Sequence, residues 1–143
     1  MKIGPLKKVT SEAIVDINHL MAQLRDDAGK TAGTKAELRA IIENKHAAMV
    51  VVEDKHRVVG VATLYILQKI GKRTAYVEDV VVDEAYRGKG LGKKLMKAIV
   101  AVAKSKKVQT VHLTSRPERK AANALYQKLG FTARKTNPYS ISL

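Results

Sequence analysis

Residues 77–92 read VEDVVVDEAYRGKGLG, an apolar run that ends in a loop with three glycines. The valines predict a buried strand, and the apolar spacing from Leu91 to Val102 predicts a helix directly after the loop. A glycine-rich turn between a strand and a helix lets backbone N–H groups approach an anion, and the helix N-terminus favours negative charge. The stretch therefore predicts a strand–loop–helix unit that binds a phosphate or a pyrophosphate.

Two common phosphate-binding loops do not fit the spacing of these glycines. A Walker A loop ending at Gly92-Lys93 would need glycine where the chain has Arg87, and Ser or Thr where it has Lys94. A dinucleotide fingerprint starting at Gly88 would need a glycine in place of Lys93. The pattern that remains is Arg87-x-x-Gly90-x-Gly92.

The rest of the chain predicts a mixture of helices and strands. Thr10 can cap a first helix that extends to Leu24, and Thr34 with Glu37 forms a capping box for a second one. Short strands are predicted over residues 7–9, 47–53, 58–70, 74–82 and 108–114, a helix over 122–129, and two final strands from Phe131 and from Tyr139. We expect an α/β fold in which residues 1–143 form a single domain, with a mixed central sheet of about six or seven strands flanked by about four helices.

Positive charge is concentrated in the second part of the chain. The protein has 27 Lys and Arg against 13 Asp and Glu, a formal net charge of +14. Residues 1–84 hold 13 basic and 12 acidic side chains, whereas residues 85–143 hold 14 basic side chains and Glu118 as the one acid. This asymmetry indicates that the second part handles an anion, the alternative being a solvated lysine face that serves solubility.

Composition excludes several classes of protein. The absence of cysteine excludes disulfides, thiolate zinc sites and a cysteine nucleophile. The four histidines are scattered without metal-ligand spacing, so we expect no metal site. No apolar run approaches the roughly 18 residues of a membrane span, and the N-terminus does not begin a secretory signal. We therefore expect a cytoplasmic protein without a membrane partner.

Two blocks of the sequence resemble one known family. Residues 77–92 are similar to the acetyl-CoA-binding motif of GNAT N-acetyltransferases, and NALYQKLGF at residues 123–131 is similar to the other signature of that family. The order and separation of the two blocks also fit. The resemblance implies a GNAT-like fold and an acyltransferase that moves an acetyl group from acetyl-CoA, its cosubstrate, to a primary amine.

The resemblance also assigns residues to acetyl-CoA. It implies that the strand before the loop separates from its neighbour and that the pantetheine arm lies along Val80, Val81 and Val82. A backbone N–H near Val80 would polarise the acetyl carbonyl and stabilise the oxyanion, and Asn123 would hydrogen-bond the arm. The pyrophosphate would be held by the side chain of Arg87 and by the amides of Gly88, Lys89, Gly90, Leu91, Gly92 and Lys93.

Glu78 and Tyr126 are the catalytic candidates that the resemblance implies. An amine with a pKa near about 10 must lose a proton before it attacks, and Glu78 matches the general base that removes it, directly or through water. Tyr126 matches the tyrosine that protonates the leaving thiolate. Asp79 is a rival base, and because side chains alternate along a strand, we expect only one of the two carboxylates to face the acceptor. Without cysteine there is no acetyl-thioenzyme, so the amine attacks directly in a ternary complex.

The acceptor remains open between a small-molecule amine and a protein amino group. Asp26 and Asp27 could attract a cationic amine, and residues 116–120 could reach the 3′-phosphate of CoA. Two other classes stay as alternatives: a basic nucleic-acid-binding module and a CoA-binding regulatory protein without catalysis. Six aromatic residues leave few stacking platforms for a nucleic acid, and the pair of Glu78 and Tyr126 favours catalysis. A homodimer is also compatible with the resemblance.

Overall fold

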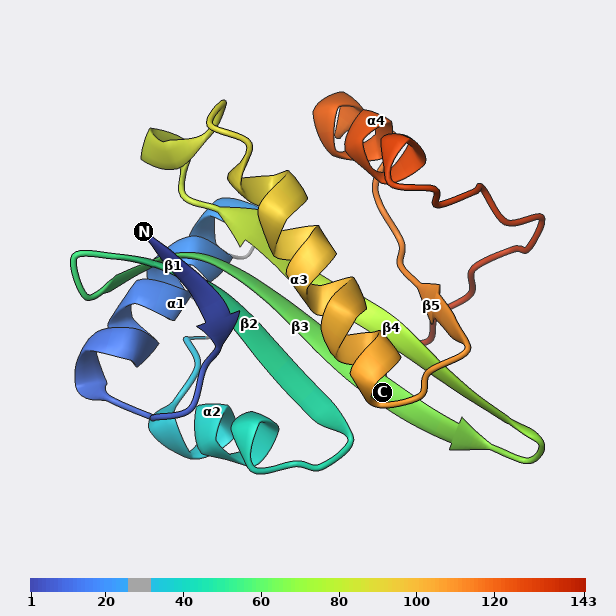
Figure 1. Ribbon diagram of the computed structural model, residues 1–143, viewed down its shortest axis with the longest axis horizontal. Helices are drawn as coiled ribbons and strands as arrows, with labels where there is room; N and C mark the ends of the chain where they lie inside the picture. The colour runs from blue at the N-terminus through green and yellow to red at the C-terminus, as the bar shows by residue number, and fades with distance from the viewer. Residues whose placement is uncertain (26–31) are drawn as a thin grey trace.

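Five strands form one mixed sheet in the described part of the chain. The computed structural model describes residues 1–25 and 32–143, so Asp26 and Asp27 lie outside the described residues. In order across the sheet, the strands are β1 (Lys2–Pro5), β2 (Ala47–Asp54), β3 (Arg57–Lys69), β4 (Lys72–Val82) and β5 (Thr110–His112). The first four pair in antiparallel fashion, and β5 joins β4 in parallel (Figure 1).

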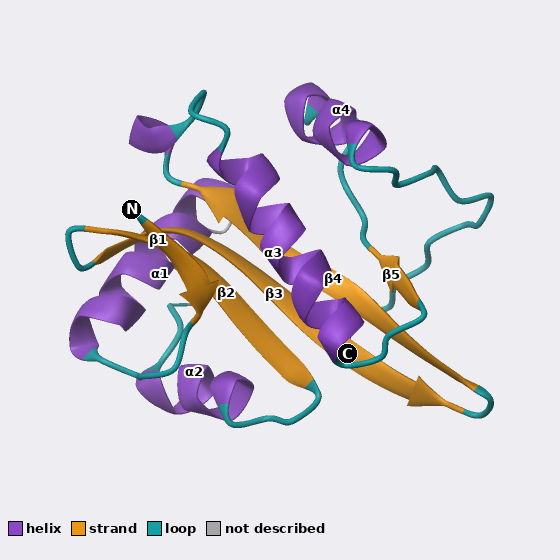
Figure 2. Ribbon diagram, in the orientation of Figure 1, coloured by secondary structure: helices purple, strands orange, loops and turns teal. Residues whose placement is uncertain are grey.

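Helices cover both faces of this sheet (Figure 2). One face carries α1 (Ser11–Leu24) and α2 (Lys35–Ile42), and the other carries α3 (Leu91–Ser105) and α4 (Lys120–Lys128). A short 3-10 turn, η1 (Glu84–Tyr86), connects β4 to the loop before α3. The predicted α/β fold with about four helices is therefore confirmed.

Two apolar cores explain the continuous apolar character of the central strands. Val51 of β2 packs with Leu20 on the α1–α2 side, whereas its neighbours Val50 and Val52 pack with Leu95 on the α3 side. A strand that is covered on both faces needs apolar side chains at every position rather than at alternate ones.

Both helix caps predicted from the sequence are confirmed. The hydroxyl of Thr10 accepts a hydrogen bond from the N–H of Ala13 at 3.0 Å. Thr34 and Glu37 form the reciprocal capping box, with distances of 3.1 and 2.9 Å between their donor and acceptor atoms. These caps satisfy N–H groups that the first turn of each helix leaves without partners.

Strand prediction was less accurate at the two ends of the chain. The first strand is Lys2–Pro5, which pairs with β2, whereas residues 7–9 form no strand. The two strands predicted from Phe131 and from Tyr139 are wrong, since residues 129–143 contain no strand. A strand requires a hydrogen-bonded neighbour, and the outer edge of β5 has none among the described residues. The apolar side chains of Tyr139, Ile141 and Leu143 are consequently exposed.

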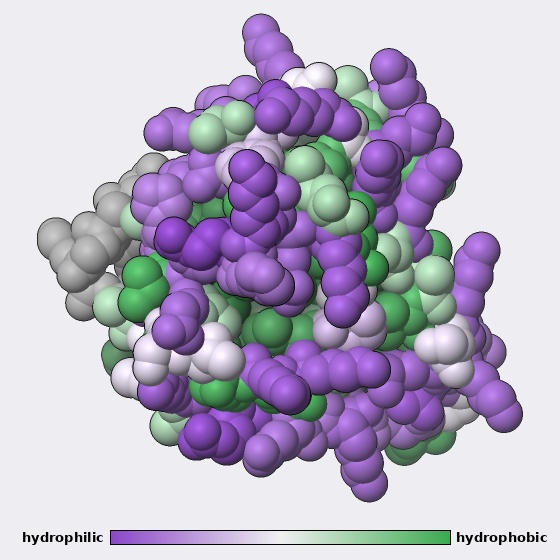
Figure 3. Space-filling model, turned by 60° about the vertical axis from the view of Figure 1, so that its left-hand side comes forward, coloured by the Kyte–Doolittle hydropathy of each residue, from purple (hydrophilic) through white to green (hydrophobic). Residues whose placement is uncertain are grey.

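Charged side chains dominate the surface. Figure 3 shows one face on which hydrophilic side chains surround smaller patches of hydrophobic surface. On α3, the lysines lie outside the buried stripe, and Lys93, Lys94, Lys97 and Lys104 are all exposed. None of the described helices is long and apolar enough to cross a membrane.

Candidate active site

The neighbouring strands β4 and β5 separate after three residues. They pair at Thr74, Ala75 and Tyr76 of β4, and β5 ends at His112, while β4 continues to Val82. From residue 77 onwards, this edge of β4 therefore has no strand partner among the described residues. The separation expected before the glycine loop is present, and it leaves an extended backbone edge to which another extended chain can hydrogen-bond.

A β-bulge interrupts β4 at this separation. Thr63 of β3 pairs with Glu78 and Val61 pairs with Val81, so Asp79 and Val80 together face one residue of β3. Asp79 has a φ of +53°, in the left-handed region that is uncommon for residues other than glycine. The extra residue breaks the alternation of side chains, and the structure brings Glu78 and Asp79 into one pocket. The prediction that only one of them faces the acceptor assumed a regular strand, and the bulge removes the alternation on which that prediction rested.

The pocket between the separated strands has a volume of about 340 Å³. It collects side chains from the end of α1, from β4, from the segment after β5 and from α4. Its lining residues are Leu24, Arg25, Val77, Glu78, Asp79, Val80, Leu113, Thr114, Ser115, Arg116, Arg119 and Tyr126. Both catalytic candidates predicted from the sequence, Glu78 and Tyr126, thus line the same pocket.

The pocket shifts the pKa values of both candidates upward. Partial burial, and then the nearby carboxylate of Asp79, raise the pKa of Glu78 above its usual range. Burial raises the pKa of the Tyr126 phenol, against a smaller opposing effect of Arg119. A carboxylate with a raised pKa is a stronger base, and a phenol with a raised pKa keeps its proton.

Three arginines line this pocket beside the two carboxylates. Nη2 of Arg25, at the end of α1, lies 3.2 Å from Oδ1 of Asp79. Nη2 of Arg119 donates to the backbone carbonyl of Leu24 at 2.8 Å, which joins the start of α4 to the end of α1. Sequence reasoning missed Arg25 and assigned Arg119 only to a segment near CoA. No local pattern signals either role, because both contacts join residues more than 50 positions apart.

The glycine loop has the conformation that its sequence requires. Gly88 and Gly90 have φ values of +77° and +74°, and an added Cβ at either would meet nothing within 4 Å. Glycine is therefore needed for backbone conformation rather than for space. Gly90 precedes α3 without a side-chain cap, and within the described part of the chain the N–H groups of residues 88–93 have no hydrogen-bond acceptor. Such a row of N–H groups at a helix N-terminus suits an anion.

The side chain of Arg87 contacts the end of β4 and the last turn of α1. Its Nε donates to the carbonyl of Val82 at 3.1 Å, and its Nη2 lies 3.5 Å from Oε1 of Gln23 on α1. Lys89 holds its ammonium 5.0 Å from the centre of the Tyr86 ring. Contact of the Arg87 guanidinium with a pyrophosphate therefore stays a prediction, whereas its contacts with Val82 of β4 and Gln23 of α1 are visible.

The three valines of β4 differ in what their side chains contact. Val80 lines the pocket, and Val80 and Val82 pack against the α3-side core. The side chain of Val81 is buried in the opposite core beneath α1, so Val81 can offer only its backbone to a ligand at the edge of β4.

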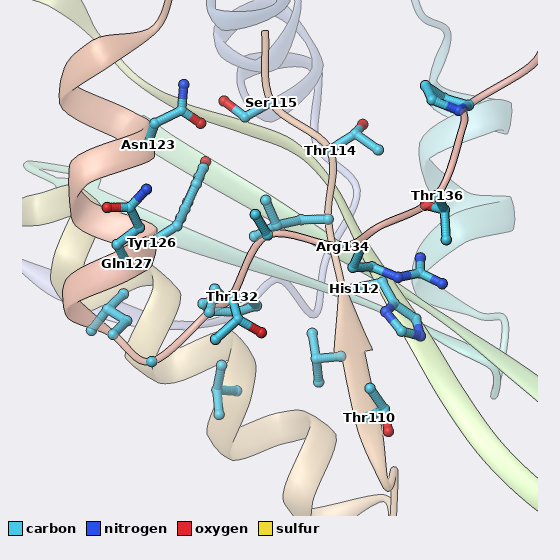
Figure 4. Close-up of a pocket in the computed structure, with 18 residues that line it drawn as sticks. Thr110, His112, Thr114, Ser115, Asn123, Tyr126, Gln127, Thr132, Arg134 and Thr136 are labelled. Carbon is cyan, nitrogen blue, oxygen red and sulfur yellow. The ribbon is translucent and has the colours of Figure 1, made fainter. Parts of the chain in front are cut away.

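Asn123 and Tyr126 project from α4 toward the segment that carries Thr114 and Ser115 (Figure 4). Nδ2 of Asn123 donates to the carbonyl of Arg116 at 3.0 Å. Both residues also line a second cavity of about 670 Å³, which lies between α3, β5, α4 and the C-terminal segment. Tyr126 borders both cavities, so its phenol stands between the separated strands and the region beneath α4.

Comparisons with known proteins agree with this geometry. The family model described as "Acetyltransferase (GNAT) family" matches residues 17–131. A glucosamine 6-phosphate N-acetyltransferase of Trypanosoma brucei brucei is 41% identical over 80 residues, which are 54% of this chain and 52% of that protein. A probable glucosamine 6-phosphate N-acetyltransferase 2 of Oryza sativa is 33% identical over 111 residues, 73% of this chain and 64% of that protein. The chain thus matches only about half to two thirds of the length of these curated relatives.

Solved structures resemble the chain over nearly its whole length. A Trypanosoma brucei acetyltransferase superposes with a TM-score of 0.79 at 26% identity, covering 99% of both chains. A putative acetyltransferase from Agrobacterium tumefaciens gives a TM-score of 0.82 at 23% identity over all of both chains, a likeness of fold. The family match over most of the chain, on a fold with separated β4 and β5 strands, shows that the chain belongs to the GNAT family of acetyltransferases.

Proposed function

We propose that the protein is an acetyl-CoA-dependent N-acetyltransferase whose acceptor carries both a primary amine and an anionic group. The observation that carries this proposal is the pocket between β4 and β5, which is lined by Glu78, Asp79 and Tyr126 and by the strand that leads into the glycine loop. GNAT acetyltransferases use acetyl-CoA as the acetyl donor, and this chain belongs to that family.

The donor half of the site is the edge of β4 together with the glycine loop. The pantetheine arm would pair with the backbone of β4 beyond residue 77, with Asn123 beside it on α4. The pyrophosphate would take the N–H groups of residues 88–93, which have no acceptor within the described part of the chain. The Val81 backbone, rather than its buried side chain, would serve this edge.

The chemistry is a direct attack of the amine on the thioester. Glu78, directly or through a water molecule, accepts a proton from the acceptor's ammonium, and the nitrogen lone pair then forms a bond to the acetyl carbon. The negative charge that develops on the carbonyl oxygen is stabilised by a backbone N–H near Val80. When the C–S bond breaks, the sulfur leaves with the electron pair and Tyr126 supplies its proton. The attacking nitrogen, which carries a positive charge after bond formation, loses its second proton as the amide forms, and a proton taken up through solvent restores the Tyr126 hydroxyl. Holding amine and thioester in one pocket supplies the entropic part of the rate.

The acceptor class follows from the charges in the pocket. Glu78 and Asp79 suit an ammonium group, while Arg25 and Arg119 line the same pocket with guanidinium groups that suit a phosphate or a carboxylate. Two relatives at 41% and 33% identity are named for glucosamine 6-phosphate, an amine that carries a phosphate. We therefore propose an amino-sugar phosphate, with glucosamine 6-phosphate as the first candidate.

A homodimer is a further part of this proposal. The large apolar side chains of Tyr139, Ile141 and Leu143 are almost fully exposed and lie close together in sequence. Neighbouring exposed apolar groups favour association. Sedimentation equilibrium is expected to give twice the chain mass of 15.7 kDa, and a mass equal to one chain at micromolar concentration would contradict the dimer.

An acceptor panel tests the proposed reaction. Release of the CoA thiol is measured with glucosamine 6-phosphate, with glucosamine, which lacks the phosphate, and with L-2,4-diaminobutyric acid, for which another relative is named. We expect kcat/KM for glucosamine 6-phosphate to exceed that for glucosamine by at least about tenfold. Glucosamine has no phosphate, so it cannot form the charged hydrogen bond that we propose between the phosphate and an arginine. Equal rates for the two sugars would contradict the anionic acceptor, and acetyl-CoA binding without thiol release from any amine would contradict catalysis.

A further inference from the structure

The turn between β4 and the glycine loop is fastened to α1 through one side chain. Oε1 of Gln23 accepts a hydrogen bond from the backbone N–H of Glu84 at 2.9 Å. The same oxygen lies 3.5 Å from Nη2 of Arg87, and Nε2 of Gln23 lies 3.5 Å from Oδ2 of Asp83. One amide thus contacts the first, second and fifth residues of the segment 83–87, which leads into Gly88.

These contacts join parts of the chain that are far apart in sequence. Gln23 belongs to the last turn of α1, and it is separated from Glu84 by 61 residues and from Arg87 by 64. His19, one turn earlier, supports the same arrangement, since its Nε2 lies 3.0 Å from Nε2 of Gln23 and 3.3 Å from Oδ2 of Asp83. The hydrogen bonds of Gln23 to Glu84 and Arg87 lie at the surface, and its contact with Asp83 is half-buried.

The segment that Gln23 holds determines where the loop begins. Asp83 caps η1 by accepting from the N–H of Ala85 at 2.9 Å, and Arg87 closes it through the carbonyl of Val82. After Arg87 come Gly88 and Gly90, whose left-handed conformations direct the N–H groups of the loop. Glycines resist rotation of the backbone weakly, so the direction of this loop depends on how firmly the preceding turn is fixed.

We propose that Gln23 is a positioning residue for the pyrophosphate loop and thereby sets the affinity of the protein for acetyl-CoA. The inference rests on the proposed use of acetyl-CoA, and it adds a residue from α1, outside both family-like sequence blocks. A residue of this kind acts before any acceptor binds. Its loss weakens donor binding while leaving the rate of the chemical step at saturating acetyl-CoA nearly unchanged.

The test is calorimetric titration of acetyl-CoA into the full-length protein and two variants. Gln23→Met keeps the length and helix propensity of the side chain but removes its hydrogen bonds. Gln68→Met is the matched control, because Nε2 of Gln68 bonds to Lys69 and Lys72 carbonyls at the β3–β4 hairpin, away from the loop. We expect a Kd about tenfold higher for Gln23→Met, equivalent to one hydrogen bond of about 1.4 kcal/mol, and an unchanged Kd for Gln68→Met.

Further outcomes separate positioning from folding and from the proposed function. The melting temperature without ligand and kcat at saturating acetyl-CoA should both stay close to wild type in Gln23→Met. An unchanged Kd in Gln23→Met would overturn the proposal, as would an equal loss in Gln68→Met. Should Gln23→Met fail to fold, Gln23→Ala serves as the second variant with the same expected Kd. Absence of binding by the wild-type protein would instead contradict its use of acetyl-CoA.

Discussion

The guanidinium of Arg25, directly after α1, forms an ion pair with the carboxylate of Asp79, which occupies the bulge of β4; Nη2 and Oδ1 are 3.2 Å apart. The two side chains are 45% and 29% exposed. An ion pair with this exposure contributes at most about 1 kcal/mol to stability. The contact is therefore better explained by its place in the pocket, where it fixes the guanidinium and the carboxylate side by side in the lining of the space that we propose for the acceptor.

Replacing Arg25 is expected to impair acceptor binding selectively. In Arg25→Gln, KM for glucosamine 6-phosphate should rise roughly 10- to 100-fold, because a charged hydrogen bond to the phosphate is lost. KM for acetyl-CoA and the melting temperature should change little. Steady-state kinetics with each substrate varied in turn measures both values, and a rise in KM for acetyl-CoA alone would show that Arg25 serves the donor instead.

Glu78 as the base predicts a specific pH dependence. Because only the ionised carboxylate accepts a proton, kcat/KM should fall as pH decreases through the pKa of Glu78, which burial and Asp79 raise above its usual range. Asp79→Asn removes one cause of the raised pKa, so the acidic limb of the profile should move to lower pH. Glu78→Gln should reduce kcat by roughly 10²- to 10⁴-fold. A Glu78→Gln enzyme with wild-type kcat would assign the base to another group.

Tyr126 as the acid predicts loss of rate without loss of affinity. Tyr126→Phe removes only the hydroxyl and keeps the ring. The centre of this ring lies 6.0 Å from the centre of the Phe131 ring. We expect kcat to fall roughly 10²-fold while the Kd for acetyl-CoA stays within a factor of two or so. Calorimetry and turnover on the same preparation provide the comparison. A large increase in Kd with little change in kcat would mean that the phenol binds the donor rather than protonating the thiolate.

Gly90 is predicted to be irreplaceable for a conformational reason. In Gly90→Ala, the alanine must keep a φ of +74°, and this left-handed conformation costs an L-residue about 1–2 kcal/mol of folding free energy. The added methyl group itself has space. The melting temperature should fall by several degrees, and acetyl-CoA should bind more weakly. Gly4→Ala in β1 is the control, since its Cβ also meets nothing within 4 Å and its φ is not positive. Equal effects of the two substitutions would exclude the conformational explanation.

Asp16 connects α1 to the β2–β3 hairpin, and its ionisation makes the stability of the folded protein depend on pH. Burial opposes ionisation of Asp16, but hydrogen bonds from the Arg57 guanidinium and from the N–H of Val58 at 2.9 Å outweigh it and lower its pKa. A lowered pKa in the folded state stabilises the protein above the ordinary value near 3.8, and this stabilisation disappears as pH falls through the folded value. Asp16→Asn should cost about 1–3 kcal/mol at pH 7, measured by urea unfolding. The difference from wild type should shrink below pH 4, and a constant difference would contradict the account.

Local patterns were sufficient to predict the strand, the glycine loop and the helix that we propose as the donor half of the site. The valine run, the glycines at 88, 90 and 92 and the apolar stripe of α3 are contiguous in sequence, and each favours one conformation. The caps at Thr10 and Thr34 are equally local. Such features are predictable because every interaction they need lies within a few residues.

Features that depend on distant pairing were not predictable in the same way. The bulge at Asp79 arises from the register between β3 and β4, so its effect on Glu78 and Asp79 is invisible in the sequence of β4 alone. The strands expected from Phe131 and Tyr139 have suitable residues but find no partner strand among residues 1–25 and 32–143. Arg25, Arg119 and Gln23 make their long-range contacts only when α1 lies beside β4 and α4.

Direct transfer of an acetyl group from acetyl-CoA to an amine is tested by following the acetyl group itself. The protein is incubated with glucosamine 6-phosphate and acetyl-CoA that carries an isotopic label in the acetyl group, and the products and the protein are examined by mass spectrometry. We expect labelled N-acetylglucosamine 6-phosphate, with free CoA in equal amount and no label on the protein. Label held covalently by the protein, or hydrolysis of acetyl-CoA to labelled acetate without any labelled amide, would contradict direct transfer to an amine in this pocket.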